Sequence, residues 1–223
     1  MDAGQDGIEH YFYPSVDGKS RNERMAVWRR FRDRGVPIVP TLVTLFETTF
    51  PSADRLRAIA NDDEGRIDPR RRYLSKFLAR DWREQAAEAS DRRSAALKKI
   101  WEEVIRRDPR EMHEAGMDIL AGSDVAAINV YPGFSLHEEM MLLVREIGLT
   151  PAEVLDRATR RSASFLGLGD TVGTFERGKV ADLVLLDGDP LQDITKALER
   201  LKAAVKAAAD HTVDDWGRTS KQP

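Results

Sequence analysis

Three short segments rich in β-branched or aromatic residues, separated by helical stretches, limit the fold of this sequence more than any other feature. They lie at residues 7–13, 36–46 and 116–122. An alternation of strands and helices is typical of parallel α/β proteins. A closed (β/α)8 barrel needs eight such strands. The three segments therefore predict a parallel α/β fold that cannot close a barrel by itself.

The spacing of apolar residues predicts the helices between and after these strands. Met25, Trp28 and Phe31 indicate a helix over residues 21–34 that ends at Gly35, and two further stretches between residues 51 and 110 have helical spacing. A helix over 136–147 ends at Gly148, and Thr150 followed by Glu153 predicts a capping box. We interpret the aromatic residues of these stretches as packing residues, namely Trp28, Phe31, Tyr73 and Trp101.

The charged residues exclude some kinds of partner. The 35 basic and 38 acidic residues give a net charge of -3, which does not favour nucleic acid or an anionic membrane. Acidic neighbours nearly balance the cluster Arg70, Arg71 and Arg72, which we interpret as a solvated helix face. Because the chain has no cysteine, a metal would need histidine, aspartate or glutamate ligands.

No export or membrane signal is visible in the sequence. The longest apolar stretches, near residues 36–46 and 180–186, are too short to span a bilayer, and the first residues are acidic. A cytoplasmic location is therefore the expectation.

The last third of the chain has a different pattern. Residues 173–187 predict two strands around the turn at residues 176–179, and residues 195–209 predict an amphipathic helix. We therefore divide the chain into an α/β part at residues 1–168, a small β unit at 169–194, and a helix with a mobile tail at 195–223.

Two residues suited to metal chemistry lie at the ends of predicted strands. His10 follows the first segment and Asp124 follows the third. In barrels, the functional groups gather at the carboxyl ends of the strands. Imidazole and carboxylate are suitable ligands for zinc or a similar divalent ion.

Several motifs together resemble the amidohydrolase superfamily, in particular the branch of imidazolonepropionase-like proteins and Xaa-Pro dipeptidases. They are GIEH at residues 7–10, AGSD at 121–124, GFSLHEE at 133–139, GLTPAE at 148–153, FLG at 165–167 and GTFERGKVADLVLLDGDP at 173–190. The resemblance implies the last three strands and helices of a (β/α)8 TIM barrel, followed by part of a small β-sandwich domain.

The resemblance also implies a function. It predicts a metal-dependent hydrolase that cleaves a C–N bond of a small amide or peptide-like substrate with metal-activated water. His10 and Asp124 would be metal ligands, zinc being the expected metal, and Asp124 would also be the catalytic proton shuttle. His137 would line the substrate pocket or support the site from behind, although a polar helix start also explains its position beside Glu138 and Glu139.

The remaining ligands of the family have no counterpart in this sequence. A His-x-His pair, a lysine or its equivalent, and another histidine belong to earlier strands of the family. A catalytic zinc site usually needs three protein ligands. Two readings stay open: a complementing chain or self-association completes the enzyme, or the chain is a truncated, non-catalytic scaffold that associates through open sheet edges.

Overall fold

The computed structural model describes residues 4–10, 16–180, 182, 184, 186 and 188–195. Three parallel segments form the centre of the fold. Strand β1 (Ile8–Glu9) pairs with β2 (Ile38–Val39) in the register Ile8 to Ile38, and Ile38 also forms a parallel bridge with Ile119. The backbone N–H of Leu120 donates to the carbonyl of Ile38 at 2.7 Å. β2 therefore lies between the first and third segments, as expected for consecutive parallel strands.

The predicted first helix is confirmed as α1 (Arg21–Asp33). Ser20 and Glu23 form a capping box at its start, and Gly35, with φ of 66°, follows its end. Met25 and Trp28 are buried on its inner face. α1 packs against α6 (Arg107–Glu114), which leads into the third parallel segment. Local capping and apolar spacing are sufficient to explain this helix.

The prediction of one strand over residues 36–46 was wrong for its second half. β2 ends at Val39, and α2 (Leu42–Thr49) begins three residues later. Pro40 has no backbone N–H to continue a ladder. Leu42, Val43 and Leu45 are buried as residues of a helix. A short apolar run does not distinguish a buried strand from a buried helix.

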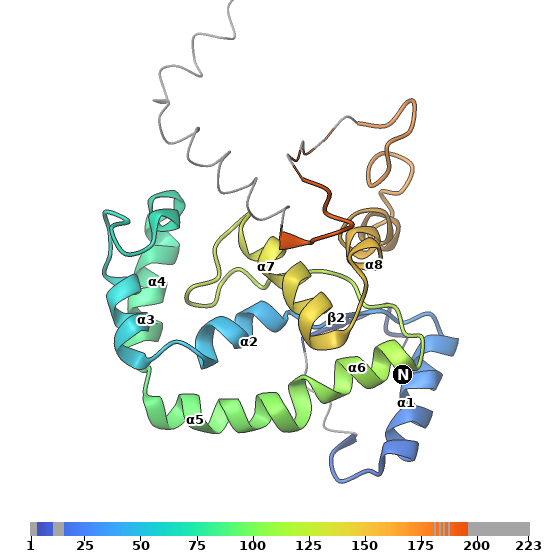
Figure 1. Cartoon of the computed structure of the whole chain (residues 1–223), viewed down its shortest axis with the longest axis horizontal. Helices are drawn as coiled ribbons and strands as arrows, with labels where there is room; N and C mark the ends of the chain where they lie inside the picture. Colours follow the sequence, from blue (N-terminus) through green and yellow to red (C-terminus); the bar gives the residue numbers. More distant parts are fainter. Residues whose placement is uncertain are drawn as a thin grey trace, which may run out of the picture.

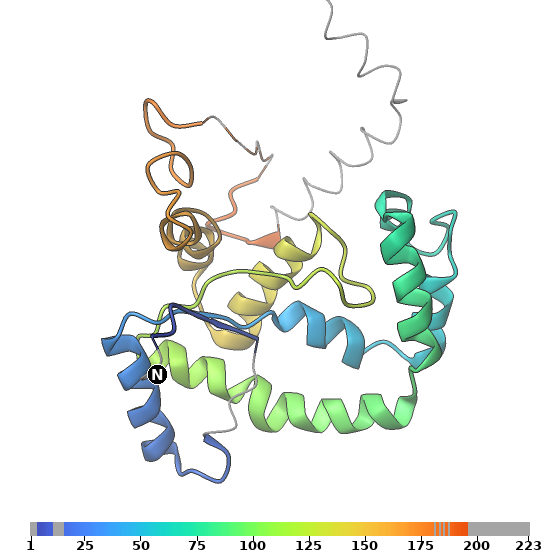
Figure 2. The ribbon, with the colours of Figure 1, turned by 180° about the vertical axis from the view of Figure 1, so that it is seen from behind.

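Most of the helices lie between β2 and the third parallel segment. After α2 they are α3 (Ala53–Ala60), the 3-10 helix η2 (Pro69–Tyr73), α4 (Lys76–Ala87), α5 (Asp91–Ile100), the π-helical η3 (Trp101–Ile105) and α6. α3 packs against α4, and the two views agree that this pair lies at the opposite end of the molecule from α1 (Figures 1 and 2). We call these helices, from α2 to α6, the insertion. The insertion extends the molecule sideways from the sheet.

Two of the three arginines of the cluster do not lie on a solvated face, contrary to the sequence-based interpretation, and only Arg72 is exposed. Arg71 is 3% exposed and donates hydrogen bonds to the carbonyls of Ile59 and Ala60. The guanidinium of Arg70 pairs with Asp68 and Glu138. Its partner Glu138 belongs to a distant helix, so local charge balance could not reveal the pairing.

The aromatic residues of the predicted helices pack as expected, with one exception. Trp28 and Trp101 are buried in the main core, and Phe31 packs against it. Tyr73 is 42% exposed and is not a core residue. A second core, between α3, α4 and the loop after the third segment, contains Leu56, Trp82 and Tyr131. The insertion thus has a small core of its own.

The helices after the third segment agree with the sequence pattern. They are α7 (Ser135–Leu142), the π-helical η4 (Leu143–Ile147), α8 (Pro151–Asp156), the π-helical η5 (Arg157–Arg161) and α9 (Ser162–Phe165). Gly148 ends η4 with φ of 93°, and Thr150 with Glu153 forms the predicted capping box of α8. α7 packs against α2, which places it over the carboxyl end of β2.

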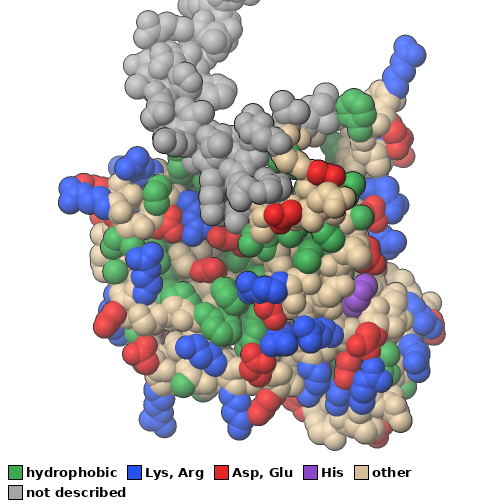
Figure 3. All heavy atoms as spheres, viewed as in Figure 1, with side chains coloured by type: hydrophobic (Ala, Val, Ile, Leu, Met, Phe, Trp, Pro, Cys, Tyr) green, Lys and Arg blue, Asp and Glu red, His purple; other side chains and the backbone are tan. Residues whose placement is uncertain are grey.

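The predicted β unit at residues 169–194 is not established. The described residues of this range contain no strand, and residues 181, 183, 185 and 187 lie outside the description. The helix predicted at 195–209 and the tail also lie outside it, apart from Thr195. Among the described helices, none is long and apolar enough to cross a membrane. Lys and Arg side chains intermingle with Asp and Glu on the face shown in Figure 3, which agrees with the near balance of charge.

Candidate functional site

The fold brings the two predicted metal-site residues together. Nδ1 of His10 lies 3.7 Å from Oδ2 of Asp124, and the two side chains are 42% and 39% exposed. His10 directly follows β1, and its backbone N–H donates to the carbonyl of Val39 at 2.8 Å. Both side chains therefore lie at the carboxyl edge of the parallel segments, accessible to a ligand from solvent.

Three neighbouring residues of this edge have left-handed backbone conformations. The φ values are 68° for His10, 48° for Thr41 and 49° for Asp124. Residues other than glycine occupy this region at a cost of about 1–3 kcal/mol each, and such residues cluster at functional sites. The rest of the fold stabilises the sharp turns that direct these three side chains toward one another.

The first turn of α2 contacts both candidate ligands. Oγ1 of Thr41 lies 3.0 Å from Nδ1 of His10. The hydroxyl of Thr44 donates to the carbonyls of Ser123, at 2.8 Å, and of Asp124, at 3.4 Å. The position of α2 therefore determines how His10 and Asp124 face each other.

Glu139 of α7 caps the start of α2 in place of a local residue. Thr41 occupies the N-cap position of α2 but its side chain accepts no capping hydrogen bond. Instead, the backbone N–H of Val43 donates to Oε2 of Glu139 at 2.7 Å, and Leu42 also donates to this carboxylate. This arrangement leaves the hydroxyl of Thr41 available to His10. Glu139 had no predicted role.

The environment of Glu139 is unusual for a carboxyl group. The residue is fully buried, and its Oε1 atom has no hydrogen-bond partner in the described part of the chain. Burial raises the pKa of Glu139 to about 8, against the opposing effect of the two backbone hydrogen bonds. The sequence pattern of strands and helices does not predict this environment. The spacing of Glu139 from Ser135 and Leu142 nevertheless places Glu139 on the buried face of α7.

A second polar cluster fastens the insertion to α7. Arg70 bonds to Glu138 and stacks over the ring of Tyr131 at 4.2 Å from its centroid. Nearby, the side-chain amide of Asn129 donates to Glu47. Burial, and then the charge of Glu138, raise the pKa of Glu47 to about 7. The sequence pattern does not predict this cluster because its members come from four separate segments.

No interaction among the described residues links His137 to His10 or Asp124. It lies in the first turn of α7, and its Nδ1 atom is buried without a hydrogen-bond partner among the described residues. Burial lowers the pKa of His137, partly offset by the charge of Glu138. A role beside the substrate stays a prediction.

The described residues supply only part of a metal site. Imidazole and carboxylate suit a divalent ion such as zinc, which usually takes three protein ligands at a catalytic site. Within the described ranges, no group of three or more His, Asp or Glu residues could hold a metal ion. His10 and Asp124 thus fit as two ligands of an incomplete set.

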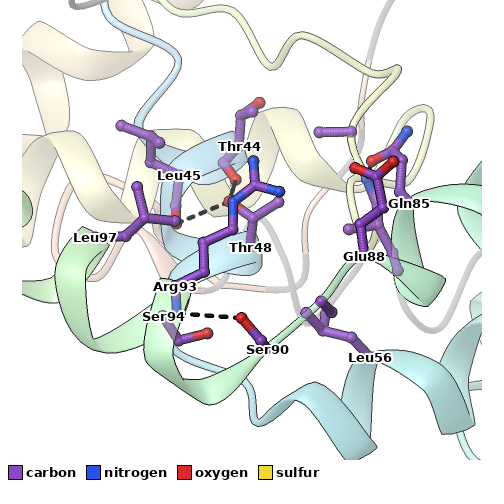
Figure 4. A pocket seen from close by; sticks show the side chains of 13 residues that line it. Thr44, Leu45, Thr48, Leu56, Gln85, Glu88, Ser90, Arg93, Ser94 and Leu97 are labelled. Atoms are coloured by element: carbon purple, nitrogen blue, oxygen red, sulfur yellow. Dashed lines mark hydrogen bonds between the residues drawn. The ribbon is translucent and has the colours of Figure 1, made fainter.

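A cavity of about 400 Å³ lies beside α2 and next to the loop of Asp124. Figure 4 shows side chains of α2, α3, α4 and α5 around this space. Two of its lining residues touch the backbone of Asp124: Thr44, through the hydroxyl described above, and Ala127, whose N–H lies 3.5 Å from the carbonyl of Asp124.

Comparison with known proteins agrees with the motifs. Residues 67–213 match the model of the amidohydrolase family. Imidazolonepropionase of Thermoplasma volcanium is 35% identical over 89 residues, which are 39% of this chain and 21% of that protein. Imidazolonepropionase of Desulfotalea psychrophila is 42% identical over 67 residues, 28% of this chain and 16% of that protein. The chain thus matches about a fifth of the length of these relatives.

Solved structures agree on the fold. A prolidase complexed with N-methylphosphonate-L-proline superposes with a TM-score of 0.55 at 21% identity, covering 89% of this chain and 37% of the prolidase. Ochratoxinase of A. niger superposes with a TM-score of 0.55 at 20% identity, covering 90% of this chain and 35% of the ochratoxinase. The α/β fold described above is therefore of the type found in these proteins.

Proposed function

The chain belongs to the amidohydrolase family, and on this premise we propose that it forms part of the active site of a hydrolase that cleaves a C–N bond in a small amide or peptide-like substrate. The observation that carries the proposal is the approach of His10 to Asp124 at the carboxyl edge of the parallel segments. Barrel enzymes place their chemistry at this edge. The motif-based division into a barrel part at residues 1–168 and a small β unit at 169–194 belongs to the same proposal.

His10 and Asp124 are proposed as two ligands of a divalent metal. Zinc is the first candidate because it accepts imidazole and carboxylate ligands together. The metal would supply a polarised water as the nucleophile at neutral pH. Thr41 orients the ring of His10 through its hydroxyl, as residues behind a metal ligand commonly do. Asp124 is exposed enough to meet a substrate, so its carboxylate can take a proton from the attacking water and give it to the leaving nitrogen.

The remaining ligands must come from outside the described residues. β1 pairs only with β2 in the described part of the chain, so the other edge of β1 can accept another strand. We propose that a complementing polypeptide, or a second copy, pairs at this edge and supplies the missing ligands. The non-catalytic alternative uses the same edge but retains no metal.

Metal analysis tests the proposal. The full chain is incubated with zinc, passed through gel filtration and assayed for bound metal, alone and after mixing with a polypeptide that contains the earlier strands of an amidohydrolase barrel. We expect zinc to be retained in the complemented sample and lost in His10→Ala and Asp124→Ala. His113→Ala and Asp54→Ala, which change a histidine and an aspartate away from the site, are the matched controls and should retain it.

Each outcome has a defined meaning. Zinc retained by the complemented sample and hydrolysis of amide substrates would support the enzyme. Zinc retained equally by His10→Ala and Asp124→Ala would show that these residues are not its ligands. An absence of zinc in every sample would leave a non-catalytic scaffold as the function of this chain.

A further inference from the structure

The cavity beside α2 has an apolar floor and a charged rim. Leu45 of α2, Leu56 of α3 and Leu97 of α5 supply apolar side chains from three directions, and Ile128 closes the wall next to the Asp124 loop. Its volume of about 400 Å³ is within the range of small-molecule sites. A ligand held here would place an apolar body against these residues.

Two opposite charges lie at the rim of the cavity. Arg93 comes from α5 and Glu88 from the end of α4, and their charged groups approach the space from opposite sides in Figure 4. Neither side chain forms an ion pair or hydrogen bond with a residue that the structure describes. Both charges are therefore available to a ligand.

The uncharged polar groups of the wall are largely occupied. The hydroxyls of Thr44 and Thr48 donate to backbone carbonyls. The side-chain amide of Gln85 donates to the carbonyl of Ala126 and accepts from the N–H of Ile128. These bonds hold the wall in shape and leave Arg93 and Glu88 as the charged groups that can select a ligand.

We propose that this cavity binds a zwitterion with an apolar body, of the size of an apolar α-amino acid. The guanidinium of Arg93 receives the carboxylate, since its planar group suits paired hydrogen bonds to carboxylate oxygens. The carboxylate of Glu88 receives the ammonium group. The leucine residues of the floor cover the side chain. The site is separate from the reacting atoms of the proposed hydrolysis and does not depend on that function.

A ligand in the cavity would affect the position of the loop that carries Asp124. Thr44 and Ala127 line the cavity and contact the backbone of Asp124. A ligand that fixes these two residues therefore also fixes the loop that carries the carboxylate. Bound amino acid would thus act on the candidate site through its positioning and not through direct contact.

Binding of L-phenylalanine to the full, metal-free chain tests the proposal by calorimetry. Two probes each lack one charge: 3-phenylpropanoate has no ammonium group, and 2-phenylethylamine has no carboxylate. The variants are Arg93→Gln and Glu88→Gln, and the matched controls are Arg92→Gln and Glu84→Gln on the same helices. Because Arg93 and Glu88 are exposed without described partners, both variants should keep the thermal midpoint of the wild type.

We expect the wild type to bind L-phenylalanine more tightly than either probe. Arg93→Gln should weaken this binding by about tenfold or more, as expected for loss of a charge-assisted hydrogen bond, and should remove the advantage over 2-phenylethylamine. Glu88→Gln should remove the advantage over 3-phenylpropanoate. The proposal is overturned if the wild type shows no saturable binding, or if both variants bind like the controls. Since no metal is present, these results are independent of the hydrolase proposal.

Discussion

The carboxyl group of Glu139 caps α2 from 96 residues away in the sequence, accepting a hydrogen bond from the backbone N–H of Val43 at 2.7 Å. This contact anchors the first turn of α2 to α7. The same turn contacts His10 through Thr41 and the loop of Asp124 through Thr44. A buried residue of α7 therefore helps to position the two candidate ligands through α2.

Removal of this cap should destabilise the protein. Glu139→Ala loses two hydrogen bonds to α2 and leaves a cavity in the core. We expect the free energy of unfolding to fall by about 2–4 kcal/mol, measured by urea denaturation. The exposed Glu102→Ala should change it by less than about 0.5 kcal/mol. An equal effect of the two substitutions would contradict the capping role.

Stability should decrease as the pH rises from about 5 to about 8. Burial raises the pKa of Glu139 to about 8 and that of Glu47 to about 7, so the folded state holds these protons more tightly than the unfolded state. Their contribution to stability is complete below the ordinary glutamate pKa, near 4.5, and is lost as the pH rises through 7 to 8. Urea denaturation at several pH values between about 5 and about 9 measures this loss.

The matched variant for the pH dependence is Glu139→Gln, which keeps an oxygen acceptor but cannot ionise. Between about pH 6 and about pH 9, we expect the free energy of unfolding of Glu139→Gln to decline less than that of the wild type. A decline of the same size in both proteins would show that Glu139 does not titrate there.

The hydroxyl of Thr41 should matter for metal binding but little for stability. Thr41→Val keeps the branched shape and removes the contact with Nδ1 of His10. We expect zinc affinity of the complemented site to fall by about tenfold, measured by competition with a chelator. Thr41→Ser restores a hydroxyl and should restore the affinity. Unchanged affinity in Thr41→Val would mean that the ring of His10 is oriented by other contacts.

Arg70 should contribute far more to the free energy of unfolding than its neighbour Arg72. The Arg70 side chain is 20% exposed and pairs with Asp68 and Glu138, so Arg70→Met leaves two acidic groups unpaired in a partly buried place. We expect a loss of about 2–4 kcal/mol in the free energy of unfolding. Arg72→Met, on an exposed residue, should change it by about 0.5 kcal/mol or less. Chemical denaturation of both variants decides between these values.

Gly122 should not tolerate a side chain. A Cβ atom at this position would lie 2.5 Å from Cγ1 of Val39, which is too close for two carbon atoms. Gly122→Ala should therefore cost about 1–3 kcal/mol in unfolding free energy. Adding Val39→Ala removes the clash and should recover part of the loss. If the double variant is no more stable than the sum of the single effects, the clash is not the cause.

The sequence by itself determined the features that depend on neighbouring residues. α1 and the capping box of α8 follow from local capping and apolar spacing, and Gly148 ends a helix where its φ requires glycine. His10 and Asp124 were predicted as partners because parallel strands end at one edge of a sheet, and the structure brings them to 3.7 Å.

Only the tertiary structure decided the features that depend on distant residues. The run at 36–46 became strand and then helix because Leu42, Val43 and Leu45 pack against the core in that form. Arg70 is paired because α7 brings Glu138 to it, and Glu139 is a helix cap because α7 lies over α2. A capping or pairing contact across many residues leaves no local spacing pattern in a sequence. It exists only once packing has fixed the positions of the helices.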